Sequence, residues 1–380
     1  MITGGELAEL VATRRWSSEA AEKLLQVEKT PLLLVDKGVL RQQSEQLHCE
    51  LPDATIHYAL KSNSHRSVAE FFGDLGIGFE ISSEGELGLL LDLGISPGNI
   101  VSSNPLKAQD FIRAAYSAGV ALFAFDSYSE IEKLSKYAPG SGVCVRLSVS
   151  NEGSEWPLSG KFGVETEQAV ELLVQAKERG LEPRGIAFHV GSQCTCPDTW
   201  VKAIEKSRVV WESVESRGIA LRLLNIGGGF PIEYTKSVPS ASEIADAIKA
   251  ALRRIFPDGV ELIAEPGRAL VGEAGIIVAS VIAKADRDGK KWVYLDVGVF
   301  NGLMETIGGI RYPVVTENRG MMSQHVLAGP SCDGFDVISP QVELPDLEIG
   351  DRVYIMSAGA YTTAYASNFN GFPVPETLLV

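Results

Sequence analysis

The sequence predicts an α/β protein, a (β/α)8 barrel of the TIM type joined to a smaller β-rich domain. Three observations lead to this fold class. Short apolar, β-branched runs alternate with longer amphipathic stretches eight times between residues 55 and 265. The alternation is lost after residue 270. The chain has 380 residues, which is long enough for one large barrel and an addition.

The eight apolar runs are the expected strands of the barrel. The segments between them have helical periodicity, and 83–93 and 165–179 carry leucine or valine stripes opposite charged residues. Eight β–α units in series favour a closed parallel barrel, and an open doubly wound sheet is the competing architecture. In chain order the expected strands are Thr55–Leu60, Ile77–Ile81, Ile100–Ser103, Ala121–Phe125, Val143–Val149, Gly185–Val190, Leu221–Ile226 and Val260–Glu265.

Apolar segments outside this range predict the second domain. Two of them flank a turn at 287–289 in the pattern of an antiparallel hairpin. We therefore expect a barrel over residues 37–270 and a β-rich domain built from 1–36 and 271–380. The segments expected to form it are 31–40, 275–285, 291–297, 324–327 and 351–356.

Composition narrows the classes of function. Asp and Glu outnumber Lys and Arg by 49 to 34, and the net charge of −15 argues against a nucleic acid or an anionic membrane as partner. No apolar run is long enough to span a membrane, and the N-terminus lacks the pattern of a secretory leader. Five scattered cysteines favour a reducing compartment, and Cys194 and Cys196 lack further ligands at zinc spacing. We expect a cytoplasmic protein without a metal.

Polar or glycine residues follow the carboxyl ends of seven expected strands, where a barrel carries its active site. Lys61 follows an apolar strand, so desolvation would lower its pKa toward the range in which an amine is a nucleophile that forms a Schiff base. The alternative is a strand-end lysine that reaches solvent. The full set is Lys61, Glu80, Asn104, Arg146, His189, Gly227–Gly229 and Glu265.

Two neighbouring segments indicate an anion site. Gly227–Gly229 lets backbone N–H groups approach a phosphate, and late βα loops are the usual phosphate site of a barrel. Arg268, three residues after Glu265, offers a guanidinium for the same phosphate. The alternative for the glycines is a tight turn without a ligand.

Glu265 and His189 complete the pattern. A buried carboxylate needs a partner, which is either a protonated ring nitrogen or a salt bridge to Arg268 or Arg146. The imidazole of His189 either stacks on a flat cofactor or fills the mouth of the barrel. A nucleophilic amine, a phosphate cradle, a stacking ring and a carboxylate for a ring nitrogen together match pyridoxal phosphate.

From Pro31 to Pro373 the chain also resembles a known family, the fold-III pyridoxal-phosphate decarboxylases of the ornithine and lysine decarboxylase group. The resemblance implies an alanine racemase-like barrel and a homodimer whose active sites use residues of both subunits. GPSCDGFD and SNFNGF are specific to this group within the fold. The motifs are HYALKSN (57–63), FEISSEGEL (79–87), SGKFG (159–163), FHVGSQC (188–194), NIGGGFP (225–231), AEPGR (264–268), GPSCDGFD (329–336) and GAYTTAYASNFNGF (359–372).

The resemblance assigns roles to individual residues. It implies that Lys61 forms the Schiff base with the cofactor and that Glu80 lies near this Schiff base. His189 would stack on the face of the cofactor ring, and Arg146 would support the residues that contact the cofactor. Glu265 matches the partner of the pyridine nitrogen, whose proton makes the ring an electron sink. The positions that match phosphate ligands are Ser192, Gly228, Gly229, Arg268 and Tyr361.

Cys332 and Asp333 match a pair that the second subunit contributes to the site. By the resemblance, Cys332 protonates the carbanion after carbon dioxide has left. Asp333 meets the distal amine of the substrate.

The segment METIGGIRYP (304–313) departs from the family pattern. Glu305 is present, but Gly308 and Gly309 stand in place of acidic residues that would pair with a distal ammonium, and the stretch is one residue shorter. A buried charged contact of this kind is worth about 1.5–3 kcal/mol. We therefore expect Glu305, Gly308 and Gly309 to line a widened substrate site together with Asp333.

These features predict a decarboxylase of a diamino acid or of an N-substituted, for example citryl-, diamino acid, in siderophore or other natural-product biosynthesis. The alternative is an L-ornithine or L-lysine decarboxylase of polyamine biosynthesis. An amino-acid racemase needs two opposed bases, and GPSCDGFD argues against it. A non-catalytic regulator of a decarboxylase would have lost cofactor contacts, which are all present here.

Overall fold

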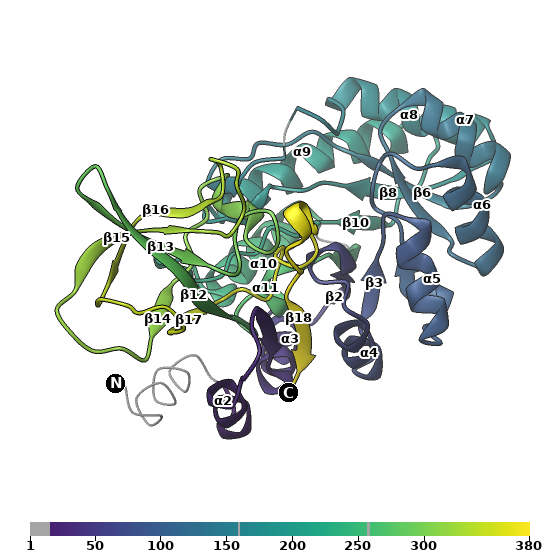
Figure 1. Cartoon of the computed structure of the whole chain (residues 1–380). Helices are drawn as coiled ribbons and strands as arrows, with labels where there is room; N and C mark the ends of the chain where they lie inside the picture. Colours follow the sequence, from purple (N-terminus) through teal and green to yellow (C-terminus); the bar gives the residue numbers. More distant parts are fainter. Residues whose placement is uncertain (1–15, 159, 257–258) are drawn as a thin grey trace. The chain divides into compact units, whose positions relative to one another are not determined.

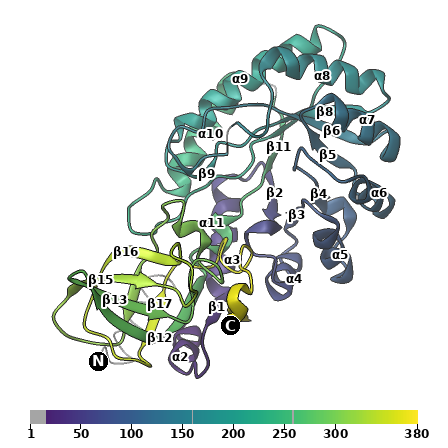
Figure 2. The same ribbon diagram turned by 45° about the horizontal axis from the view of Figure 1, so that its top comes forward.

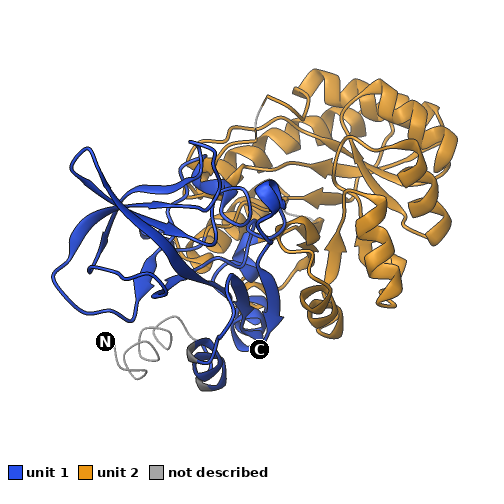
Figure 3. Ribbon diagram, viewed as in Figure 1, with its two compact units in different colours: residues 1–45, 232–238, 268–380 blue, residues 46–231, 239–267 orange. Residues whose placement is uncertain are grey.

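The computed structural model describes residues 16–158, 160–256 and 259–380. The chain divides into two compact units (Figure 3). One comprises residues 46–231 and 239–267, and the other comprises 1–45, 232–238 and 268–380. The second unit thus takes a short insertion from within the range that we assigned to the barrel, and the division at 37 and 270 stays a prediction.

The first unit is a parallel eight-stranded barrel, as predicted (Figures 1 and 2). The strands follow the order β4-β3-β2-β11-β10-β8-β6-β5. A parallel bridge between Ser102 and Phe123 joins the two ends of this order, since Ser102 N donates to Leu122 O at 3.0 Å and Ala124 N to Ser102 O at 2.8 Å. The strands are β2 Ala54–Ala59, β3 Gly78–Glu80, β4 Ile100–Val101, β5 Leu122–Phe125, β6 Gly142–Arg146, β8 Glu182–Ala187, β10 Leu223–Asn225 and β11 Glu261–Ala264.

Helices follow the strands of the barrel and cover its outside in both views (Figures 1 and 2). Serine residues cap the N-termini of several of these helices. The Ser83 and Ser127 side chains accept hydrogen bonds from backbone N–H groups of the first turn, and Ser240 forms a capping box with Glu243. The helices of the repeat are α4 Arg66–Asp74, α5 Glu84–Asp92, α6 Gln109–Ala118, α7 Tyr128–Tyr137, α8 Thr166–Glu178, α9 Asp198–Glu215 and α10 Ala241–Ile255.

The interior of the barrel is packed with small and branched side chains. Cys144, Ala187, Leu223 and Ile263, from four adjacent strands, form one buried cluster. Because parallel strands are covered on both faces, their sequences read as nearly continuous apolar runs, which is why the strands were recognisable. A small antiparallel pair lies outside the barrel sheet, formed by β7 Ser154–Trp156 and β9 Ser192–Cys194, which we did not predict.

The second unit contains a mixed eight-stranded sheet, which confirms the β-rich domain. Its path runs β14-β17-β12-β13-β15-β16, and β1 joins β12 to β18. The predicted hairpin is β12–β13, and its turn places Asp288 and Gly289 at φ values of 50° and 72°, as a two-residue hairpin loop requires. The strands are β1 Leu32–Val35, β12 Gly275–Arg287, β13 Lys290–Leu295, β14 Val314–Thr316, β15 Ser323–Ala328, β16 Val337–Leu344, β17 Arg352–Ile355 and β18 Glu376–Leu379.

Further helices complete the described structure. Four are 3₁₀ helices, and two of these, η1 and η3, carry residues that the sequence assigned to the active site. The remaining elements are α2 Ser18–Leu25, α3 Lys37–Glu50, α11 Arg268–Val271, η1 Leu60–Ser62, η2 Pro97–Asn99, η3 Met304–Thr306 and η4 Phe369–Gly371. Within the described ranges no helix is long and apolar enough to cross a membrane.

Candidate active site

Lys61 and Glu80 lie together at the carboxyl end of the barrel. Lys61 is in η1, directly after β2, and Glu80 is the last residue of β3, which pairs with β2. The ammonium forms an ion pair with the Glu80 carboxylate, which is 2% exposed, whereas the Lys61 side chain is 46% exposed. The barrel thus presents an accessible amine against a buried carboxylate. The exposure of Lys61 agrees with a lysine that reaches solvent, and its role as a nucleophile stays a prediction.

Glu265 accepts hydrogen bonds from two polar side chains of the barrel, one on the neighbouring strand β10 and one that follows β4. Its Oε1 accepts from Asn225 Nδ2 at 2.6 Å and from the Ser103 hydroxyl. Burial raises the pKa of Glu265, and the Glu80 carboxylate adds to this, while the bonds from Ser103 and Asn225 oppose it. Both bonds end on Oε1, and within the described ranges no donor is bonded to Oε2, which can therefore accept from a further donor such as a protonated ring nitrogen.

Ser103 and Asn225 were missed as site residues by sequence reasoning. Both stand inside segments that were singled out, the strand IVSS and the motif NIGGGFP. Both side chains are buried, and a buried polar side chain at a strand end needs a partner. That signal was available from the sequence, although the partner was not.

His189 follows β8 and is half-buried. Its Nδ1 accepts from the Gly191 N–H at 3.0 Å, which places the ring proton on Nε2. Burial lowers the pKa of His189 well below its usual value, and the charges of Arg146 and Lys61 add to this. The imidazole is therefore neutral, as a ring that stacks on a flat aromatic group should be.

The glycine loop approaches this histidine closely. A Cβ on Gly228 would lie 3.4 Å from His189 Nε2 and 2.5 Å from the Glu265 carbonyl oxygen. Gly227 is fixed from both sides, because its N–H donates to Asn225 Oδ1 at 2.9 Å and its carbonyl accepts from Glu265 N at 2.8 Å. In the part of the chain that the structure describes, the N–H groups of Gly228 and Gly229 donate to no other group, so these two adjacent donors are available to a ligand.

Arg146 and Ser192 also lie in the barrel unit. Arg146 ends β6, and burial lowers the pKa of its guanidinium while the carboxylates of Glu265, Glu80 and Asp126 favour its charge. Ser192 opens β9, where its carbonyl accepts from Ser154 Oγ at 2.7 Å. The barrel unit therefore contains eight of the predicted residues: Lys61, Glu80, Arg146, His189, Ser192, Gly228, Gly229 and Glu265.

The second unit holds the other predicted residues. Arg268 and Glu305 form a buried bidentate ion pair, and the Arg268 guanidinium carbon lies 4.9 Å from the centre of the Tyr361 ring. Glu305 is in η3, and Gly308 and Gly309 follow it. A Cβ on Gly309, whose φ is +103°, would meet no atom within 4 Å, so this turn is open.

Cys332 and Asp333 lie on the loop between β15 and β16. Cys332 is exposed, and both its N–H and its Sγ lie 3.2 Å from Asn370 Oδ1. The Asp336 carboxylate holds the start of this loop, because it accepts from Val299 N at 2.7 Å and from Ser331 N at 2.9 Å. The contact between Cys332 and Asn370 joins the motifs GPSCDGFD and SNFNGF, which are both specific to the family.

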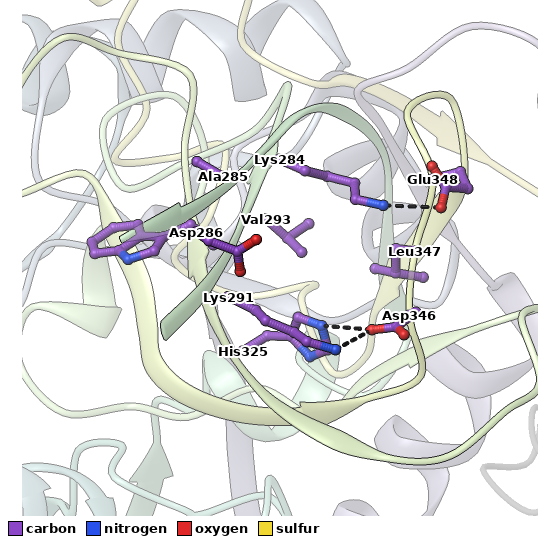
Figure 4. A pocket seen from close by; sticks show the side chains of 10 residues that line it. Lys284, Ala285, Asp286, Lys291, Val293, His325, Asp346, Leu347 and Glu348 are labelled. Carbon is purple, nitrogen blue, oxygen red and sulfur yellow. Dashed lines mark hydrogen bonds and ion pairs between the residues drawn. The ribbon is translucent and has the colours of Figure 1, made fainter. Parts of the chain in front are cut away.

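A cavity of about 300 Å³ lies in the second unit but contains none of the predicted residues (Figure 4). Lys284 points toward Glu348, with 3.0 Å between the charged atoms, and Lys291 toward Asp346, with 2.5 Å. Its cationic side chains are thus already paired with carboxylates. Ten residues line it: Lys284, Ala285, Asp286, Lys291, Trp292, Val293, His325, Asp346, Leu347 and Glu348.

The barrel residues fit pyridoxal phosphate on structural grounds. An accessible amine, two free backbone donors, a neutral imidazole and a buried carboxylate with one open oxygen correspond to the aldehyde, phosphate, ring face and ring nitrogen of that cofactor. No group of three or more His, Cys, Asp or Glu side chains in the described ranges is placed to hold a metal ion.

Comparison with known proteins decides the family. The family described as pyridoxal-dependent decarboxylase, pyridoxal binding domain, matches residues 37–272. The chain belongs to this family. It is a pyridoxal-phosphate-dependent amino-acid decarboxylase with the fold of the ornithine and lysine decarboxylase group, which confirms the resemblance drawn from the motifs.

Relatives match this decarboxylase over nearly its whole length. A protein named lysine/ornithine decarboxylase from Selenomonas ruminantium is 34% identical over 369 residues, which are 96% of this chain and 93% of the relative. The crystal structure of lysine/ornithine decarboxylase complexed with cadaverine from Vibrio vulnificus is 37% identical, with a TM-score of 0.89 over 96% of this chain and 99% of that one. Antizyme inhibitor 2 of Xenopus laevis is 34% identical over 85% of this chain and 75% of its own length.

Proposed function

We propose that this decarboxylase acts on a free basic amino acid, L-lysine or L-ornithine, and releases the corresponding diamine and carbon dioxide. The observation that carries the proposal is the likeness over nearly the full length to proteins named for these two substrates, one of them complexed with cadaverine. We expected an N-substituted diamino acid as the main substrate. None of the relatives compared above is named for such a compound, so the alternative interpretation takes precedence.

Lys61 would hold the cofactor covalently, and Glu80 would orient its amine through the ion pair. The N–H groups of Gly228 and Gly229 would bind the phosphate together with Ser192, and Arg268 and Tyr361 of the second unit have the same role in this proposal. Glu265 would pair with the protonated ring nitrogen through Oε2, the oxygen to which neither Asn225 nor Ser103 donates. Bound pyridoxal phosphate supplies an electron sink for the carbanion left by the departing carbon dioxide.

His189 and Arg146 would support the cofactor from the barrel. His189 is neutral and can lie against the ring without a charge, and Arg146 balances the two buried carboxylates Glu80 and Glu265. Cys332 would donate a proton to the substrate carbon, and Asp333 would accept the distal ammonium.

A homodimer follows from this assignment. Cys332 and Asp333 lie on a loop that exposes Cys332, and Phe335 on the same loop is 75% exposed. An exposed aromatic side chain beside two proposed site residues is typical of an interface. We propose that this loop of one subunit serves the active site of the other, in a cytoplasmic enzyme whose five cysteines are free.

Two measurements test the function. Purified protein with pyridoxal phosphate should release carbon dioxide from L-lysine or L-ornithine and form cadaverine or putrescine. The bound cofactor should absorb in the visible range, and borohydride should bleach the band. Lys61→Ala should abolish the band and Lys202→Ala, at an exposed ion pair with Glu152, should keep it.

The outcomes separate the candidates. Absence of carbon dioxide from every amino acid tested would overturn the proposal in favour of a regulator, and a change of configuration without loss of mass would indicate a racemase. Release only from Nω-substituted diamino acids would establish the second candidate. That candidate is favoured by Glu305, whose two oxygens are taken by Arg268, and by the open turn at Gly309.

A further inference from the structure

Glu305 occupies an unexpected place in the second unit. Its Oε1 accepts from Arg268 Nη2 at 2.6 Å and its Oε2 from Arg268 Nη1 at 2.8 Å. Both side chains are only 2% exposed. The parallel geometry of two donors and two acceptors is the strongest form of arginine–carboxylate pairing.

This pairing leaves Glu305 poorly suited to meet a substrate. An ammonium ion would have to compete with a fixed guanidinium for oxygens that are both already engaged. Releasing Arg268 would leave a buried charge without its counter-ion, which is strongly unfavourable. The carboxylate that the sequence assigned to the substrate is therefore committed to another residue.

Arg268 is fixed by further contacts. Its Nη1 donates to the Tyr234 hydroxyl at 2.5 Å, and the Tyr361 ring lies against the guanidinium, 4.9 Å from centre to carbon. Burial disfavours the charge of Arg268, but Tyr234 and Glu305 outweigh it and raise the pKa of Arg268 well above its usual value. One edge of the guanidinium is thus held by a carboxylate and one face by a ring.

We propose that Glu305 is a positioning residue that acts through Arg268 and does not contact the distal ammonium of the substrate. The inference rests on the proposed function, because Arg268 matters to the enzyme as a cofactor-binding residue. Glu305 sets the plane of the guanidinium, while Tyr234 and Tyr361 complete its support. Recognition of a distal charge then falls to residues other than Glu305.

The first experiment measures cofactor binding without turnover. We expect Glu305→Gln to raise the dissociation constant for pyridoxal phosphate at least fivefold, since glutamine retains only one of the two acceptors. In an Arg268→Gln background the same substitution should change the constant less than twofold, because the residue through which it acts is gone. A constant that stays unchanged or falls in the single variant, or equal effects in both backgrounds, would overturn the proposal.

Two controls keep this experiment interpretable. Glu348→Gln removes an exposed ion pair with Lys284 in the same unit and should leave cofactor binding unchanged. If Arg268→Gln does not fold, Arg268→Lys replaces it, since lysine keeps the charge and loses the planar fork.

The second experiment asks whether Glu305 meets the distal charge. Cadaverine and n-pentylamine have the same chain length and differ in one terminal ammonium, so the ratio of their inhibition constants reports recognition of that group. The ratio should stay within twofold of the wild-type value in Glu305→Gln. A tenfold or larger loss of preference for cadaverine would mean that Glu305 contacts the substrate.

Failure of the proposed function gives a different result from failure of this inference. If the wild-type protein decarboxylates neither lysine nor ornithine, the function is wrong, but the two-background cofactor titration still tests the pair. If decarboxylation occurs and the titration shows independent effects, the function stands and the positioning role of Glu305 falls.

Discussion

Gly228→Ala offers the most direct test of the glycine loop. The added Cβ would stand 2.5 Å from the Glu265 carbonyl oxygen, whereas ordinary contact begins at 3.4 Å, so the backbone has to shift by about 0.9 Å (3.4 − 2.5). That backbone cannot move freely, because Glu265 N donates to Gly227 O at 2.8 Å and Asn225 holds both segments. Such overpacking costs about 1–3 kcal/mol of folding free energy.

Urea unfolding of the cofactor-free protein measures this cost, and a titration with pyridoxal phosphate measures its effect on the site. We expect Gly228→Ala to lose about 1–3 kcal/mol of stability and to bind the cofactor at least about tenfold more weakly, because a shift of the loop moves the two N–H groups that we propose as phosphate donors. Gly88→Ala is the matched control: it lies in α5, where an added Cβ meets no atom within 4 Å, and should stabilise the protein by about 0.5–1 kcal/mol. A Gly228→Ala protein with wild-type stability and cofactor affinity would refute the steric argument.

Three further predictions concern single residues. Burial lowers the pKa of His57 from 6.5 to about 4, so at falling pH the unfolded chain takes up the His57 proton before the folded chain does, and the free energy of unfolding falls between pH 6.5 and 4. In acid titrations of unfolding, the free energy of unfolding of His57→Gln should fall by about 3 kcal/mol less than that of the wild type over this interval. Asn225→Leu leaves the Gly227 N–H without its acceptor and removes one of the two donors to Glu265 Oε1, so it should cost about 1–3 kcal/mol in urea unfolding, and a neutral outcome would contradict the network. Cys332→Ala should lower kcat about 10²–10⁴-fold with the bleachable cofactor band intact, and an unchanged kcat would remove Cys332 from the proton transfer.

The barrel was predictable because the apolar runs and the helical periodicity in the sequence coincide with the strands and helices of the fold. Each of the eight apolar runs became a strand within a few residues of its expected limits; the run Leu221–Ile226, for example, became β10 at Leu223–Asn225. The predicted helices 83–93 and 165–179 became α5 and α8. Strands that are covered on both faces carry an unbroken apolar signal, and that signal survives in a single sequence.

The strands that escaped prediction lack this signal. β18 has alternating exposed and half-buried residues, and the strands of the β7–β9 pair are only three residues long. β16 contains the exposed Pro340, and its buried residues, Ile338, Ser339 and Leu344, do not alternate with exposed ones as in a regular half-buried strand. Such segments are strands because a neighbour offers hydrogen bonds, which a local pattern does not record.

Some of the side-chain pairs in the candidate site could be predicted from the sequence, and others could not. Residues at strand ends, such as Lys61 and Glu80, could be placed together because parallel strands end at one edge, and they do form an ion pair. Glu305 could not be assigned to Arg268, because the two stand 37 positions apart and Glu305 sits on a turn of the second unit. Its motif indicated a substrate contact, and only its position shows that both carboxylate oxygens are in use.

Two buried carboxyl groups in this enzyme illustrate how surroundings decide chemical roles. Glu265 has one oxygen bound by Asn225 and Ser103 and one open, while Glu305 has both oxygens bound by a guanidinium. An open oxygen on a buried carboxyl, whose pKa is raised, can share a proton with a ligand. A carboxylate closed by a bidentate arginine can only orient its partner. In the functions proposed above, Glu265 therefore pairs with the cofactor ring and Glu305 positions Arg268.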